Sequence, residues 1–171
     1  MKRLCCLLFL FSLTAWSPPQ KEVDEYNLKA AFIYNFSKYI DWGPYQKGNE
    51  FTIGVLGNSP ISKPLAEIAI TKTVNNKKIV ILQFFKPQDV TFCNILFISR
   101  HNAYAMDGFL SRLSQGMLTI GEAEGMSEDG AAFNFIIADN KLKFEANLKS
   151  ISTAGLKASS ELLQHAIIVD Q

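Results

Sequence analysis

The sequence predicts an α/β fold: a single-domain three-layer sandwich with a mostly parallel, Rossmann-like sheet, a C-terminal antiparallel hairpin and flanking helices. Strand-like apolar runs alternate with helix-like segments up to residue 120, and this order favours parallel strands. Met117–Ile120 is a short run of the kind found in strands covered on both faces. Asp139-Asn140 separates two further strand-like runs, as a hairpin turn does. We therefore expect one domain, over residues 22–171.

The first 17 residues are predicted to be a signal peptide. Lys2 and Arg3 form a basic start, and Leu4–Leu13 is an apolar run that is too short to span a bilayer of about 30 Å. The cleavage point stays open because Pro18 follows the small-x-small site. We expect a periplasmic protein, with an uncleaved membrane anchor as the alternative.

The first helix is predicted over about Glu22–Trp42 and is stopped by Gly43-Pro44. It is apolar around most of its circumference, so it must be covered on more than one side, either by its own domain or by a partner. Its last turn, with Tyr39 and Trp42, is a candidate partner interface. The helix carries two neighbouring apolar stripes, Tyr26, Ala30, Ile33 and Ile40, and Leu28, Phe32, Phe36 and Tyr39.

A strand-to-helix turn is predicted at residues 57–60. In this turn Ser59 is the expected N-cap and Pro60 the first helical residue. The strands are predicted at Phe51–Leu56, Lys78–Phe84, Asn94–Ser99, Met117–Ile120, Ala132–Ile137 and Leu142–Ala146. The later helices are predicted from Pro60 to about Ile70, from near Asn102 around Phe109–Leu113, at Leu148–Thr153 and at Ser159–Val169.

Polar residues follow three of the predicted strands. In doubly wound sheets, ligands bind beyond the carboxyl ends of strands where the strand order reverses. If the strands at 51–56, 94–99 and 117–120 are neighbours, these polar groups form a cleft. Arg100 and the helix starting at Pro60 would suit a small anionic ligand. Alternatively, Arg100 pairs with Glu122, the turn residues only cap, and nothing binds. The candidate cleft residues are Asn58, Ser59, Ser99, Arg100 and Glu122.

The loop Glu122–Ala131 is long, acidic and contains glycine. It is either a solvated loop or a recognition loop held on a rigid scaffold. Glu122 and Met126 are therefore added to the candidate partner interface.

Composition argues against several functional classes. After removal of residues 1–17 the chain has 15 basic and 16 acidic residues, so it lacks the positive charge that nucleic-acid binding needs. Cys93 is the one cysteine left, which excludes an internal disulfide. His101 and His165 lack metal-ligand spacing, and there is no G-x-S-x-G motif. We predict no catalytic residues, no metal and no cofactor.

Four blocks of the sequence carry a family resemblance. The first, Y-x-L-K-A-A-F-I-Y-N-F-x-K-Y-I-x-W, begins at Tyr26, shortly after the predicted signal peptide. The others are FTIGVLG with NILFIS, LTIGEAEGMSEDGAAFNFI, and KFEANLKSISTAGLKASSELLQHAIIV. Together they resemble the YfiR/HmsC-like family of periplasmic regulators.

The resemblance implies a non-enzymatic protein that binds the periplasmic sensor domain of an inner-membrane signalling protein. The expected partner is a diguanylate cyclase, whose restraint would lower cyclic di-GMP and biofilm-type output; a homodimer is also possible. Some relatives carry paired cysteines with a suggested redox role, and this chain departs from them. Two alternatives stay open: a small-ligand sensor that partners a histidine kinase or other receptor, and an enzyme that uses the strand-end cleft.

Overall fold

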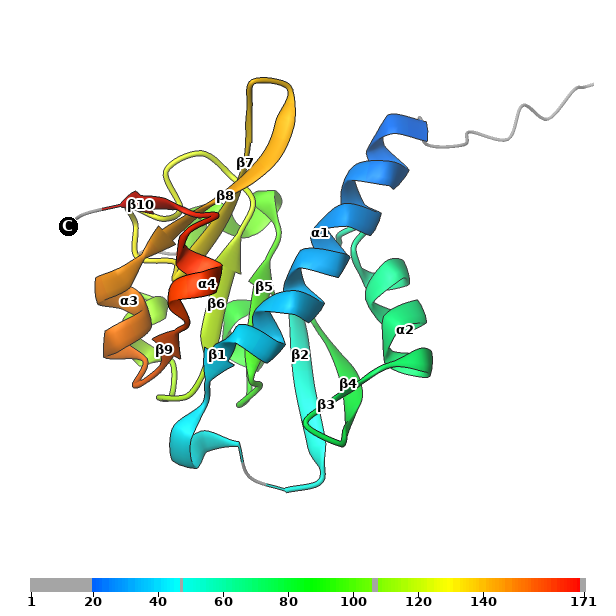
Figure 1. Ribbon diagram of the computed structural model, residues 1–171, viewed down its shortest axis with the longest axis vertical. Coiled ribbons are helices and arrows are strands. Elements are labelled where there is room, and N and C mark those ends of the chain that lie inside the picture. Colours follow the sequence, from blue (N-terminus) through cyan, green and yellow to red (C-terminus); the bar gives the residue numbers. More distant parts are fainter. Residues whose placement is uncertain (1–19, 47, 106–107, 170–171) are drawn as a thin grey trace, which may run out of the picture.

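The computed structural model describes residues 20–46, 48–105 and 108–169. Within them the chain forms an eight-stranded sheet in the order β10-β8-β7-β6-β5-β2-β4-β3, and a two-stranded sheet of β1 and β9 (Figure 1). The predicted signal peptide lies outside these residues. The strands are β1 (Ile40–Asp41), β2 (Glu50–Leu56), β3 (Thr73–Val74), β4 (Lys77–Phe84), β5 (Ile95–Ile98), β6 (Leu118–Gly121), β7 (Phe133–Ala138), β8 (Lys141–Asn147), β9 (Lys157–Ala158) and β10 (Ile167–Val169).

Parallel pairing dominates the large sheet. β4, β2, β5, β6 and β7 are parallel neighbours, and β7 turns back antiparallel into β8. Asp139 and Asn140 occupy the hairpin turn with φ of 53° and 57°, the left-handed conformation that two-residue hairpin turns require. The predicted fold class is therefore confirmed: a mostly parallel α/β sheet with an antiparallel hairpin and flanking helices.

The longest described helix crosses one face of the sheet, between α2 on one side and α4 on the other (Figure 1). The α-helices are α1 (Gln20–Tyr39), α2 (Ser62–Thr71), α3 (Leu148–Thr153) and α4 (Ser160–Leu163). The 3₁₀ segments are η1 (Gly43–Tyr45), η2 (Pro87–Asp89), η3 (Arg100–Ala105) and η4 (Leu110–Arg112). None of the helices described is both long and apolar enough to cross a membrane.

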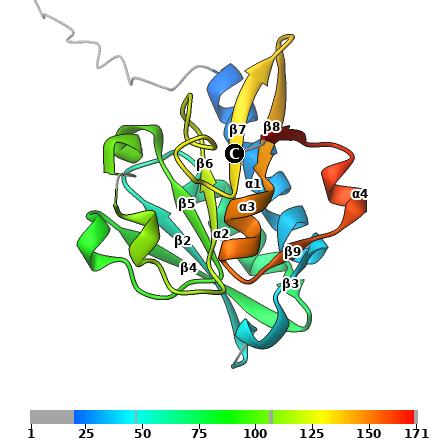
Figure 2. The same cartoon turned by 90° about the vertical axis from the view of Figure 1, so that its left-hand side faces the viewer.

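The sheet carries a hydrophobic core on each face. Successive residues of β2 alternate between the two cores, Ile53 and Val55 in one and Leu56 in the other, as the pleat of a strand requires. The first core packs under α1, α2 and α4. The second is covered by 3₁₀ segments and loops between β4 and β7, and the green segments among them lie on the side away from α4 in Figure 2. Gly54 faces the second core, where an added Cβ would come within 2.8 Å of the Cys93 Sγ atom.

Three predicted helices differ from the observed ones. α1 ends at Tyr39, because Ile40 and Asp41 pair with β9. The helix expected around Phe109 is replaced by the short 3₁₀ segments η3 and η4. The helix expected over Ser159–Val169 covers only the residues of α4, and Ile167–Val169 extends the sheet beside β8. The backbone of this β-branched run forms hydrogen bonds with the edge of β8, whose N–H and C=O groups would have no such partner if the run were a helix.

The domain itself covers most of α1. Its first apolar stripe is buried throughout, with Ala30 and Ile33 both 0% exposed. In the second stripe, Phe36 is 0% exposed and Leu28 is 47% exposed. Trp42 is only 2% exposed, and its Nε1–H donates a hydrogen bond to the Ser37 carbonyl at 3.0 Å. The expectation that Trp42 lies in an exposed last turn of the helix is therefore wrong.

Candidate functional site

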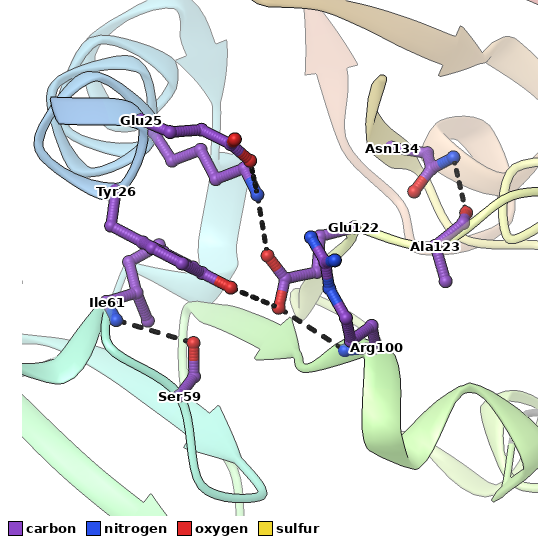
Figure 3. A network of polar contacts seen from close by, with 9 residues as sticks. Glu25, Tyr26, Ser59, Ile61, Arg100, Glu122, Ala123 and Asn134 are labelled. Carbon is purple, nitrogen blue, oxygen red and sulfur yellow. Dashed lines mark hydrogen bonds and ion pairs between the residues drawn. The ribbon is translucent and has the colours of Figure 1, made fainter. Parts of the chain in front are cut away.

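Three neighbouring parallel strands, β2, β5 and β6, have their carboxyl ends at the same end of the sheet. This adjacency confirms the condition on which the predicted cleft depended. The structure adds the N-terminal half of α1, which passes over the same end and brings Glu25, Tyr26 and Lys29 to it (Figure 3).

Glu122, directly after β6, is the centre of a buried polar network. Its side chain is 1% exposed. The Oε1 atom accepts hydrogen bonds from the Tyr26 hydroxyl and the Arg100 backbone N–H, both at 3.3 Å, while Oε2 accepts from Lys29 Nζ at 2.7 Å (Figure 3). A carboxylate away from water is tolerated only when its acceptor positions are used in this way.

Lys29 forms a buried ion pair with Glu122, and the Lys29 side chain is 2% exposed. It forms a second ion pair with Glu25, 2.7 Å from Oε1, and its Nζ lies 4.5 Å from the centre of the Tyr26 ring. Sequence reasoning missed this residue. Its signal was positional: Lys29 falls three residues after Tyr26 and four before Ile33, on the stripe that faces the core.

Tyr26 acts as a hydrogen-bond donor. Burial raises the pKa of its hydroxyl to about 12, with the charge of Glu122 adding to the rise and that of Arg100 opposing it. Tyr26 therefore stays protonated at neutral pH and keeps its bond to Glu122.

A cleft of about 640 Å³, the strand-end cleft, opens beside this network. The Arg100 side chain is exposed at its wall, and its guanidinium forms no salt bridge to any residue the structure describes. The predicted pairing of Arg100 with Glu122 therefore occurs through the backbone, and the guanidinium stays available. The cleft is lined by Glu22, Glu25, Tyr26, Asn58, Ser59, Pro60, Arg100, His101 and Glu122.

The turn before α2 is more closed than predicted. The regular helix begins at Ser62. Ser59 Oγ accepts from the Ile61 N–H at 3.3 Å, and the Ser59 carbonyl accepts from the Ser62 N–H at 3.3 Å. The prediction of Ser59 as the helix N-cap and Pro60 as the first helical residue is therefore wrong: the N-cap position is Ile61, without a side-chain cap, and Ser59 closes the turn before it. The backbone N–H groups of Ile61 and Ser62 are thereby already used and do not face a ligand.

Ser99 differs from the other predicted cleft residues. Its side chain is buried and donates to Asn102 Oδ1 at 3.0 Å, and it does not line the cleft. The two side chains lie beneath Gly57, which has φ of +90° and whose position an added Cβ would fill only by clashing with them. Ser99 therefore holds the turns together.

A second hollow of about 460 Å³, the acidic groove, lies on the other side of the network. It shares Glu25, Arg100 and Glu122 with the strand-end cleft, so the buried ion pairs form the wall between the two hollows. Its lining is Glu25, Lys29, Arg100, Glu122, Glu124, Gly125, Glu128, Phe135, Ile136, Ile137, Leu142 and Glu145.

The loop of residues 122–131 is partly buried. Met126 is 0% exposed and packs in the second core, whereas Glu124 and Glu128 are exposed. Met126 and Glu122, both named as candidate partner-interface residues, are therefore too buried to contact a partner. Among the four residues of the predicted partner interface, Tyr39 alone keeps a partly exposed side chain.

The described residues hold no group of three histidine, cysteine or acidic side chains placed to bind a metal ion. Cys93 is a free, buried thiol, and burial raises its pKa to about 12. A thiol with such a pKa is a poor nucleophile at neutral pH.

Comparison with known proteins yields one family and one fold. The model of the family described as YfiR/HmsC-like matches residues 26–167. No curated protein matches the chain. Among solved structures, the chain is similar to a conserved domain protein from Vibrio cholerae O1 biovar El Tor strain N16961, with a TM-score of 0.58 and 15% sequence identity. The match covers 85% of this chain and 60% of that protein, and at this identity it shows the fold alone.

Proposed function

The chain belongs to the YfiR/HmsC-like family, and we propose that it is an exported, non-enzymatic regulator that acts by protein contact. Its partner would be the periplasmic sensor domain of an inner-membrane signalling protein, with a diguanylate cyclase as the first candidate. The family match over residues 26–167 carries this proposal.

The mechanism that we propose is a population shift. The regulator binds the inactive form of the sensor domain more tightly than the active form and so lowers cyclic di-GMP. A non-catalytic role fits the polar network, because the Glu122 carboxylate already accepts three hydrogen bonds and Tyr26 stays protonated. Both side chains are thus engaged in holding α1 to the end of β6.

Gene deletion tests the proposed function. Loss of the protein should raise cyclic di-GMP or the output of a membrane sensor, and exported protein should restore the low level. The control is a chain that starts at residue 18 without an export signal, which should fail to restore it. Unchanged cyclic di-GMP and sensor output after deletion would refute the regulatory role.

A second candidate function is a small-ligand sensor, favoured by the Arg100 guanidinium at the strand-end cleft. Thermal-shift titrations with acetate, succinate and inorganic phosphate would test it. Arg100→Ala should abolish any stabilisation, because a guanidinium binds carboxylate and phosphate through two parallel hydrogen bonds. Arg112→Ala, at an exposed arginine outside the cleft, is the matched control. Stabilisation that survives Arg100→Ala would exclude this site.

A further inference from the structure

We propose that the acidic groove is the contact site for the partner, and that it accepts an extended, apolar segment with basic side chains as an added strand beside β7. This inference rests on the proposed function and identifies the surface through which the protein would contact its partner. The groove combines an unpaired strand edge, apolar side chains and unpaired negative charge.

The strand edge comes from a difference in length between neighbouring strands. β6 pairs with β7 only at Ile120–Phe133 and Gly121–Asn134 and then ends. β7 continues to Ala138, held by β8 on its other side alone. In the part of the chain that the structure describes, no strand covers the remaining edge of β7, and the hairpin extends beyond its neighbours (Figure 1). An open edge of this kind can accept a strand from another protein.

The side chains beside that edge are apolar. Phe135, Ile136 and Ile137 line the groove together with Leu142 from β8. Ile137 is 57% exposed, and Ile136 and Leu142 are half-buried. A strand added here would bury these side chains against alternate side chains of its own.

The charge of the groove selects the kind of strand. Five glutamates line it against one lysine and one arginine. Lys29 already neutralises part of this charge through its ion pairs with Glu25 and Glu122. Glu124, Glu128 and Glu145 have no salt bridge to a described residue. The two lysines of the hairpin, Lys141 and Lys143, are not part of the lining.

The same charge argues against a second copy of this chain as the occupant. Two copies that paired through β7 would bring their unpaired glutamates together, and like charges at an interface oppose association. A segment with alternating apolar and basic residues supplies both the missing hydrogen-bond partners and the missing positive charge.

A peptide of four Leu-Lys repeats is the probe, and one of four Leu-Glu repeats is its control. With the isotope-labelled chain from residue 18, we expect the Leu-Lys peptide to shift the amide resonances of Phe135–Ala138 and to slow their hydrogen exchange. The double variant Glu124→Lys/Glu128→Lys should weaken this binding about tenfold or more, since each reversal replaces an attraction by a repulsion. Glu50→Lys/Glu67→Lys changes the net charge equally at exposed sites outside the groove and should leave the affinity close to that of the parent.

Three outcomes would overturn the proposal. The first is equal binding to both charge variants, and the second is binding that leaves the β7 amides unchanged. The third is a concentration-dependent dimer of the parent chain that protects the β7 edge, because the occupant would then be a second copy. Circular dichroism and melting curves of both variants confirm that each is folded.

The cellular readout separates this proposal from the function on which it rests. If deletion of the gene raises cyclic di-GMP, Glu124→Lys/Glu128→Lys should fail to lower it again, and Glu50→Lys/Glu67→Lys should succeed. Full repression by the groove variant would refute the groove and leave the regulatory function standing. No effect of the deletion would refute the function itself.

Discussion

The two faces of the sheet are covered in different ways. On one face, α1 lies over an aromatic core in which the Phe36 ring centre is 4.7 Å from that of Phe133 and 4.9 Å from that of Phe144. On the other face, 3₁₀ segments and loops cover a core built around Leu96, Cys93 and Met126. Regular helix thus supports the first core, and irregular chain supports the second.

This difference indicates that the helix-covered face contributes mainly to stability and the loop-covered face to recognition. A long helix buries a continuous stripe and resists local change, whereas loops on a rigid scaffold can carry contact residues. The exposed acids Glu124 and Glu128 lie on the loop side, while the buried acid Glu122 anchors α1. The helix-covered face and the loop-covered face therefore meet at the polar network around Glu122, where α1 is held to the end of β6.

The largest expected effect comes from emptying the aromatic core. Phe36→Ala should cost about 3–5 kcal/mol of unfolding free energy, because a fully buried ring leaves a cavity among other rings. Phe109→Ala, which removes a ring that is 4% exposed from the other face, should cost less by about 1 kcal/mol or more, since loose turns settle into the space. Urea unfolding of both variants measures the difference. Equal losses would mean that the two faces are equally rigid.

The second prediction concerns the ion pair that ties α1 to the sheet edge. Lys29→Met should cost about 3 kcal/mol, because it leaves the Glu122 carboxylate buried without its cation. Lys29→Met/Glu122→Gln removes both charges and should recover part of that loss. Equilibrium unfolding of the parent, the single and the double variant forms the test. A double variant less stable than the single one would show that Glu122 is stabilised without Lys29.

Tyr26→Phe should have a smaller effect, about 1 kcal/mol, since it removes one hydrogen bond to Glu122. It should also change the response to alkali. The Tyr26 pKa rises from 10.0 in its ordinary state to about 12 in the fold, so the proton is held more tightly in the folded chain. The contribution of this pKa difference to the free energy of unfolding is fully present below pH 10 and is lost as the pH approaches 12. Urea unfolding between pH 9 and pH 12 should show a shallower decline for Tyr26→Phe than for the parent.

The smallest effect is expected at Cys93, on the opposite face. Reductant should leave the melting temperature of the protein unchanged, both in the parent and in Cys93→Ser, because Cys93 is the one cysteine after residue 17. The Cys93 pKa rises from 9.0 to about 12, so its contribution to stability begins to fall at pH 9, before that of Tyr26. A reductant-sensitive dimer of the parent, absent from Cys93→Ser, would contradict this and indicate an intermolecular disulfide.

Local sequence predicted those elements whose signals are local. The hairpin turn at Asp139-Asn140, the α-helix at Leu148–Thr153 and the buried parallel strands were all found where turn chemistry and apolar runs placed them. These features need only neighbours in the chain to be specified. The adjacency of β2, β5 and β6 was only a condition of the predicted cleft, and the structure established it.

Long-range packing decided the rest. Ile167–Val169 has an apolar pattern that suits a helix or a strand, and the open edge of β8 made it a strand. Glu25 and Lys29 show an i,i+4 spacing in the sequence, but Glu122, 93 residues beyond Lys29, is brought to that lysine only by the fold. The free edge of β7 likewise exists only because β6 stops first. Sequence periodicity records which residues avoid water, whereas the partner that each residue meets depends on chain segments far away, and tertiary structure alone brings those together.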